Sequence, residues 1–180
     1  ATNNSYAAIA ASRGRVSRNK IFIVRTGPDP KRLKIAPADL SLKMGRRFLV
    51  SYLGVMAPQD GVDYFIKAID IIVNNYKRDD ISFTLIGSGD SFKDLKEMSA
   101  GLGLSKFVNF TGRIPDEELV RQLSSADVCV APDPKNALND NSTMNKILEY
   151  MAMARPVVSF DLKEARYSAG EAALYARPND

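Results

Sequence analysis

The sequence predicts an α/β domain in which helices cover both faces of a doubly wound parallel sheet. From residue 47 onward, short apolar runs alternate with amphipathic stretches, and the runs are apolar at nearly every position. Strands that are apolar throughout are typical of parallel sheets buried on both faces. The length of 180 residues, with 45% hydrophobic content, allows one domain with a substantial core. The prediction is a Rossmann-like domain over residues 47–180, preceded by a basic segment over residues 1–46.

Each strand is predicted where a short apolar run ends at turn residues. The predicted strands are residues 48–53, 81–86, 107–110, 128–131, 156–160 and 172–175. Each helix is predicted where apolar residues recur every three or four positions. The predicted helices run from Val62 to Tyr76, from Phe92 to about Gly101, from Pro115 past Leu123, and from an N-cap at Asn141 or Ser142 to Ala152. The order of the strands in the sheet does not follow from the sequence.

The first 46 residues are less regular and strongly basic. A short helix is expected over residues 6–13, a first strand over 21–24, a turn over 27–30 and a linker over 39–44. Residues 1–47 carry eleven Lys or Arg against two Asp, a net charge of +9, whereas the rest of the chain carries −5. A basic arm can meet nucleic acid or anionic lipid, but this one has no aromatic stacking platform and no RNA-binding signature. A solvated connecting segment is therefore the favoured interpretation, and no nucleic-acid partner is expected.

Composition and missing motifs exclude several kinds of chemistry. The chain has no histidine, which excludes a His general base and a His-ligated metal, and its single cysteine excludes an internal disulfide. No P-loop, nucleophile elbow or Asp-x-Asp pair is present, and the turn Gly87-Ser88-Gly89 lacks the third glycine of a dinucleotide fingerprint. No apolar run approaches the length of a membrane span.

Several predicted strands end in residues that suit a ligand crevice. Gly54 follows the first, residues 87–89 the second, residues 111–113 the third, and the polar loop 132–143 the fourth. In an open parallel sheet, ligands bind at the carboxyl ends of the strands, and glycine there allows close approach to the backbone. One glycine alone would be an ordinary strand end, but several together predict a binding crevice.

The richest stretch is the polar loop that leads into the helix ending near Ala152. The free amides at a helix N-terminus attract anions, and Lys146 adds a full positive charge. Glu149 follows three residues later on the same helix face. This arrangement suits a nucleoside diphosphate, with amides and Lys146 on the phosphates and Glu149 on the ribose hydroxyls. A surface helix with an ordinary Lys146–Glu149 ion pair explains the same pattern equally well, and both interpretations stay open on chemistry alone.

From about Gly54 to Asp180, the sequence resembles the C-terminal half of the group 1 family of retaining GT-B glycosyltransferases. The resemblance rests on motifs in the family's order: Gly54 with residues 61–68, then Leu85 to Gly89, Phe110 to Arg113, Leu123 to Pro132, Lys146 to Ala152, and Arg155 to Val158. Residues 18–33 resemble the strand and turn with which this half begins.

The resemblance implies a domain that binds a nucleotide-activated sugar. The donor-binding positions that it implies are Gly54, Gly87, Arg113, Asn141, Ser142, Thr143, Met144, Lys146 and Glu149. Glu149 corresponds to the second acid of the family's Glu-x7-Glu element and is expected on the ribose. Lys146 and Glu149 are the expected catalytic residues. The resemblance implies no metal and no cofactor beyond the donor substrate.

Two positions depart from the family pattern. The first acid of Glu-x7-Glu is Asn141, and the Arg and Lys that usually follow the first strand are Val55 and Asp60. An acid at position 60 would repel a diphosphate that it faced. The hypothesis is that Lys146, with Arg113, supplies the missing positive charge.

The implied reaction is transfer of a sugar from a nucleotide diphosphate donor to an acceptor glycan or glycolipid, with retention. The implied partner is the missing N-terminal domain of the same enzyme, and the implied setting is polysaccharide biosynthesis in the cytoplasm, with peripheral contact at the inner membrane face. A nucleotide-sugar epimerase of similar fold and a non-catalytic nucleotide-binding module remain as alternatives.

Overall fold

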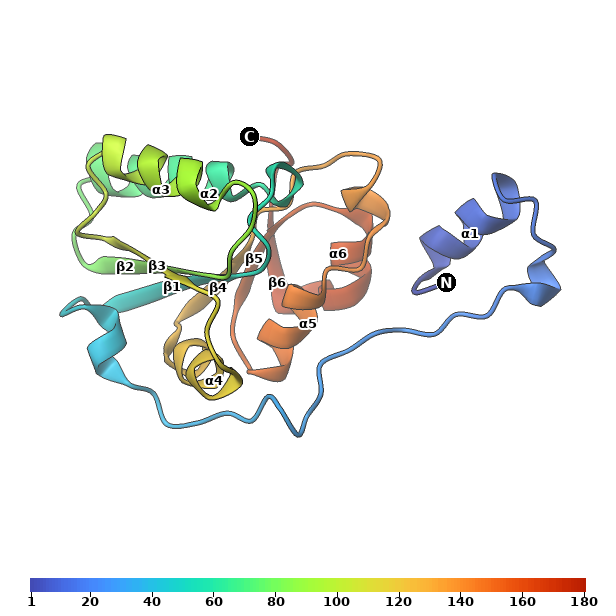
Figure 1. The fold of residues 1–180 in the computed structure, drawn as a ribbon, viewed down its shortest axis with the longest axis horizontal. Coiled ribbons are helices and arrows are strands. Elements are labelled where there is room, and N and C mark those ends of the chain that lie inside the picture. The colour runs from blue at the N-terminus through green and yellow to red at the C-terminus, as the bar shows by residue number, and fades with distance from the viewer.

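Six parallel strands form one sheet in the computed structural model, which describes residues 1–180 (Figure 1). The strands are β1 (Phe48–Leu53), β2 (Ile81–Ile86), β3 (Val108–Gly112), β4 (Val128–Ala131), β5 (Val157–Phe160) and β6 (Ala173–Ala176). Their order across the sheet is β3-β2-β1-β4-β5-β6, and every neighbouring pair is parallel. The predicted doubly wound Rossmann-like fold is therefore confirmed.

Helices cover both faces of the sheet. They are α2 (Val62–Asp70), α3 (Phe92–Gly101), α4 (Asp116–Ser125), α5 (Asn145–Ala152) and α6 (Lys163–Ala169). The remaining helix, α1 (Asn4–Ser12), belongs to the N-terminal segment and lies away from the sheet (Figure 1). Figure 1 shows α2 and α3 on one face and α4 and α5 on the other. Separate core clusters form on the two faces, one containing Phe65 and Phe83 and the other Leu123 and Ile147. The burial of both faces explains why the strands are apolar throughout.

Some predicted elements differ in their bounds or were missed. The helix predicted up to Tyr76 changes at Ile71 into a π-helical turn over Ile71–Asn75. The helix α6 was not predicted. Neither Asn141 nor Ser142 caps α5: residues 139–141 form their own 3-10 turn, the chain then extends, and Met144 becomes the N-cap without a side-chain hydrogen bond.

The N-terminal segment contains the predicted short helix but not the predicted strand. Residues 21–24 are outside the sheet, and Phe22 and Val24 are 75% and 73% exposed. Their backbone hydrogen-bonds with the first residue of the chain: the Val24 amide donates to the Ala1 carbonyl at 2.9 Å, and the amino group of Ala1 donates to the Phe22 carbonyl at 2.8 Å. The prediction of a strand was wrong because no strand of this chain lies beside the segment. The turn expected over residues 27–30 falls at 30–32, and residues 40–43 form a 3-10 turn.

The backbones of β1 and β2 meet closely where both strands end. Gly87 has a φ of +127°, and a Cβ there would lie 1.9 Å from the carbonyl oxygen of Gly54. Glycine at position 87 is thus required by both conformation and space. None of the helices combines the length and the apolar composition that a membrane span requires.

Replacing Gly87 with alanine should lower the free energy of unfolding by more than about 3 kcal/mol. The cost of the left-handed backbone and the cost of the clash with the Gly54 carbonyl both contribute to this loss. Gly101→Ala is the matched control, since a Cβ there meets nothing within 4 Å. That change should alter stability by less than about 1 kcal/mol. Urea unfolding of both variants checks the prediction, and equal losses would contradict it.

Candidate functional site

A cavity of about 440 Å³ lies at the carboxyl ends of the first three strands and the start of α5. It is lined by Leu53, Gly54, Val55, Asp60, Gly87, Ser88, Arg113, Met144, Asn145, Lys146 and Glu149. The strand order reverses between β1 and β4, which pair only at Val50 with Val128 and at Ser51 with Cys129. Beyond those residues the two strands are no longer paired, which is where ligands bind in folds of this class.

The side chain of Tyr150 holds α5 at this opening. Its hydroxyl accepts a hydrogen bond from the Leu53 amide at 2.8 Å and donates one to the Val130 carbonyl at 3.1 Å. Tyr150 is fully buried, and burial raises the pKa of its phenol well above the ordinary value, so the hydroxyl keeps its proton. One side chain thus joins the unpaired ends of β1 and β4 and fixes the helix that lines the cavity.

Lys146 lines the cavity, but its amine forms an ion pair with a buried acid. Its Nζ lies 2.7 Å from Asp133 Oδ1, 3.9 Å from Asp60 Oδ1 and 5.0 Å from the centre of the Tyr52 ring. Lys146 is only 8% exposed, and Asp133 only 1%. The second oxygen of Asp133 is buried with no hydrogen-bond partner. Two acids therefore face one lysine, so this cluster carries no spare positive charge.

Gly54 has a local structural role as well as its place in the cavity wall. A Cβ at this position would lie 2.7 Å from the hydroxyl oxygen of Tyr52 and 3.1 Å from Cε of Lys146. A larger residue would displace one of these side chains. Gly54 is therefore needed for the Lys146 position whether or not a ligand binds.

The remaining positive features of the cavity are Arg113 and the start of α5. Arg113 is exposed and makes no side-chain hydrogen bond or ion pair within the chain. No side chain caps α5 at Met144, so its first amides are open to an anion.

Glu149 faces the same cavity and pairs with a residue from the N-terminal segment. Its Oε1 accepts a hydrogen bond from Arg32 Nη2 at 2.9 Å, while Oε2 has no partner. Burial raises the pKa of Glu149, and Arg32 opposes that shift. The Lys146–Glu149 ion pair, which is the alternative explanation of the sequence pattern, does not form.

Six of the nine predicted donor-binding residues line the cavity: Gly54, Gly87, Arg113, Met144, Lys146 and Glu149. The other three do not line it. Asn141 Nδ2 donates to the Ala137 carbonyl, Ser142 Oγ hydrogen-bonds with the Tyr6 hydroxyl, and Thr143 Oγ1 accepts from Asn3. The roles assigned to all nine residues stay predictions.

The sequence prediction missed Asp133 and Arg32. Asp133 follows β4 at the carboxyl edge of the sheet, a position that could have marked it. Arg32 meets Glu149 across 117 residues of sequence, and only the charge of its segment pointed to it.

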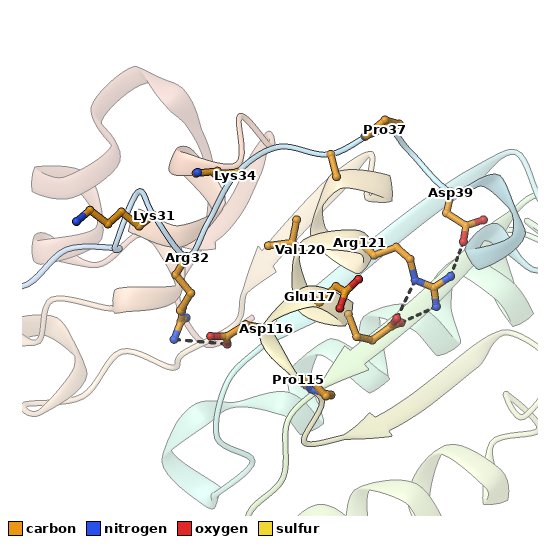
Figure 2. A pocket seen from close by; sticks show the side chains of 12 residues that line it. Lys31, Arg32, Lys34, Pro37, Asp39, Pro115, Asp116, Glu117, Val120 and Arg121 are labelled. Atoms are coloured by element: carbon orange, nitrogen blue, oxygen red, sulfur yellow. Dashed lines mark hydrogen bonds and ion pairs between the residues drawn. The ribbon is translucent and has the colours of Figure 1, made fainter.

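A larger cavity, of about 710 Å³, lies between residues 31–39 and the first turns of α4 (Figure 2). Its charged side chains mostly pair with one another: Arg32 with Asp116, and Arg121 with Asp39 and Glu118. No strand residue lines this cavity. The chain has no cluster of three or more His, Cys, Asp or Glu side chains that could hold a metal ion.

Comparison with known proteins assigns the family. Residues 47–180 match the family described as glycosyl transferases group 1, and the chain belongs to that family. The chain is 24% identical over 167 residues to the 2-deoxystreptamine glucosyltransferase of Streptomyces kanamyceticus, covering 88% of this chain and 41% of that protein. It is 30% identical over 116 residues to the alpha-D-kanosaminyltransferase of the same organism, covering 64% of this chain and 28% of that protein.

Solved structures show the same fold. A glycosyltransferase from Rickettsia africae has a TM-score of 0.80 at 15% identity, with 99% of this chain and 48% of that chain covered. HepE of Anabaena, in complex with UDP-glucose, has a TM-score of 0.75 at 20% identity, with 100% of this chain and 50% of that chain covered. The chain spans half or less of the length of these proteins.

Removing the amine of Lys146 should leave the buried Asp133 without its counter-ion. Lys146→Met should therefore lower the free energy of unfolding by about 3 kcal/mol, and Asp133→Asn added to it should recover much of that loss. Lys67→Met removes an exposed ion pair with Asp63 and should cost less than about 1 kcal/mol. Denaturant unfolding measures all three variants. Equal losses for the two lysine variants would show that the Lys146 pair is not buried as described.

Asp60 should make stability depend on pH. Burial raises its pKa above the ordinary value of 3.8, although Lys146 opposes the shift. Between 3.8 and the raised pKa, the folded protein binds more protons than the unfolded chain, so the contribution of Asp60 to stability falls as pH rises. Asp60→Asn should therefore gain stability relative to wild type as pH rises through that window, while its oxygen still accepts from the Ala57 amide. Urea unfolding across the acid range checks this, and a difference that is constant or shrinks with pH would contradict it.

Proposed function

We propose that this chain is the donor-binding, C-terminal half of a glycosyltransferase. The reaction is transfer of a sugar from a nucleotide diphosphate donor to an acceptor, with retention at the anomeric carbon. One observation carries the proposal: a cavity at the strand-order reversal brings the uncapped start of α5, Arg113 and Glu149 together in a member of the group 1 family. The neighbour HepE, whose structures contain UDP and UDP-glucose, supports the donor class.

In this proposal, each part of the donor meets a different wall of the cavity. The free Oε2 of Glu149 accepts hydrogen bonds from the ribose hydroxyls. The amides that begin α5 and the guanidinium of Arg113 face the diphosphate. The backbone at Gly54 and Gly87 allows the nucleotide to approach closely.

Stabilising the departing diphosphate requires positive charge placed before the reaction begins. The charge of Lys146 is shared with Asp133 and Asp60, so we assign the larger part of this role to Arg113 and the α5 amides. Lys146 contributes by pairing with Asp60 in the cavity wall and with the buried Asp133. No metal is part of this proposal.

The acceptor is proposed to meet a second domain of the same enzyme. The chain spans half or less of its relatives' length, and the apolar segment 21–24 is largely exposed without a neighbouring strand. An active site between two domains would leave this half able to bind nucleotide but unable to transfer sugar.

The acidic cluster favours one rival function. Asp60 and Asp133 place two carboxylates beside one lysine, which weakens the field for a leaving diphosphate. A non-catalytic module that binds nucleotide without turning it over would tolerate this arrangement. Turnover of the complete protein with a nucleotide sugar and acceptor separates the two functions.

The donor site is tested by ligand-observed NMR of this chain with UDP, GDP, ADP and CMP. One diphosphate should bind, and Glu149→Ala should weaken it about tenfold or more, because hydrogen bonds to a charged group are lost. Glu171→Ala removes an exposed acid elsewhere and should change nothing. Binding that ignores both the base and Glu149→Ala would contradict the proposal.

A further inference from the structure

We propose that Arg32, which lies outside the sheet domain, is a positioning residue that holds the Glu149 carboxylate oriented and charged for the donor ribose. The inference rests on the proposed function and adds a residue from the N-terminal segment to the site. Its basis is one long-range contact, between Arg32 Nη2 and Glu149 Oε1 at 2.9 Å.

The chain around Arg32 is fixed to the domain. The next residue, Leu33, is 4% exposed and belongs to the core cluster that contains Leu123. A few residues later, the Ala36 amide donates to Ser124 Oγ at 3.0 Å, at the end of α4. Figure 2 shows this segment running alongside α4, with Arg32 directed at Asp116. The guanidinium is therefore delivered to Glu149 by an anchored backbone.

Arg32 is the counter-ion of Glu149. Its Nη1 lies 3.8 Å from Asp116 Oδ1, so the guanidinium sits between two acids. The other charged groups that line the cavity are Asp60, Arg113 and Lys146, and none of them forms an ion pair with Glu149. Lys146 is committed to Asp133.

The contact occupies one carboxylate oxygen and leaves the other free. Arg32 holds Oε1, whereas Oε2 has no hydrogen-bond partner in the chain, and Glu149 lines the cavity. We infer that this contact orients the side chain and leaves Oε2 to accept from a ligand. Burial favours the protonated acid, in which one oxygen becomes an O–H donor, and the guanidinium favours the carboxylate, in which both oxygens only accept. The Glu149 side chain is 18% exposed against 41% for Arg32. Because Arg32 is exposed, its removal should change the pKa of Glu149 and the affinity for nucleotide more than the free energy of unfolding.

The test compares Arg32→Ala with Arg32→Lys and with Lys31→Ala. Lys31 is the matched control, because it carries the same charge in the same segment and makes no ion pair. The first measurement is a carbon-detected NMR titration of the Glu149 carboxyl, which needs no nucleotide. The second is the affinity for the diphosphate that wild type binds, UDP, GDP or ADP, measured as a function of pH.

Arg32→Ala should raise the pKa of Glu149, weaken nucleotide binding roughly three- to tenfold near neutral pH, and move the acid limb of the binding profile to higher pH. Arg32→Lys should reverse much of these three changes, and Lys31→Ala should match wild type. Thermal unfolding of Arg32→Ala should stay close to wild type.

An unchanged Glu149 titration in Arg32→Ala would overturn the inference, as would an equal shift in Lys31→Ala. Nucleotide binding that Glu149→Ala abolishes but Arg32→Ala leaves intact would overturn it while the proposed function stands. If wild type binds none of UDP, GDP and ADP, the proposed function fails, and the titration still decides whether Arg32 sets the charge of Glu149.

Discussion

The hydroxyl of Tyr150 satisfies the constraint on which the rest of the site depends. Where β1 and β4 stop pairing, their backbone groups lose their partners inside the protein, and an unsatisfied buried group is costly. Tyr150 meets the Leu53 amide and the Val130 carbonyl with one oxygen. The same contact fixes the angle of α5, so the start of that helix and the side chain of Glu149 face the opening. The cavity therefore exists because β1 and β4 stop pairing before their carboxyl ends.

Charge balance then decides what the cavity can bind. Lys146 is buried and must be paired, and Asp133 supplies the partner. This pairing moves the positive character of the cavity away from Lys146 and toward Arg113 and the helix amides. Glu149 is balanced in turn by Arg32, from outside the sheet domain. The site thus depends on the N-terminal segment as well as on the strands.

The sequence predicted the sheet well because each strand is buried on both faces and is therefore apolar throughout. It missed α6, because the apolar residues that this helix buries, Ala165 and Ala169, are small, and its other buried residue is the acid Glu164. It predicted a strand at residues 21–24 from the same apolar signal, but a strand also needs a neighbour, which a local pattern cannot reveal.

The candidate site was predictable in part. Gly54, Gly87 and Arg113 could be grouped because each follows a strand that the pattern had already identified. The ion-pair partners of Lys146 and Glu149 could not be predicted. A local pattern shows that a residue is charged, but it does not show which oppositely charged residue it contacts. The Arg32–Glu149 contact, across 117 residues, is of this kind.

The central claim is that the donor binds in the cavity lined by Gly54, Gly87 and the start of α5, at the carboxyl ends of the strands. Amide chemical-shift mapping with a saturating nucleoside diphosphate tests it directly. The account predicts the largest shifts at Gly54, Gly87 and the first amides of α5. Shifts that gather instead at Asp116 and Val120, in the larger cavity beside α4, would contradict it.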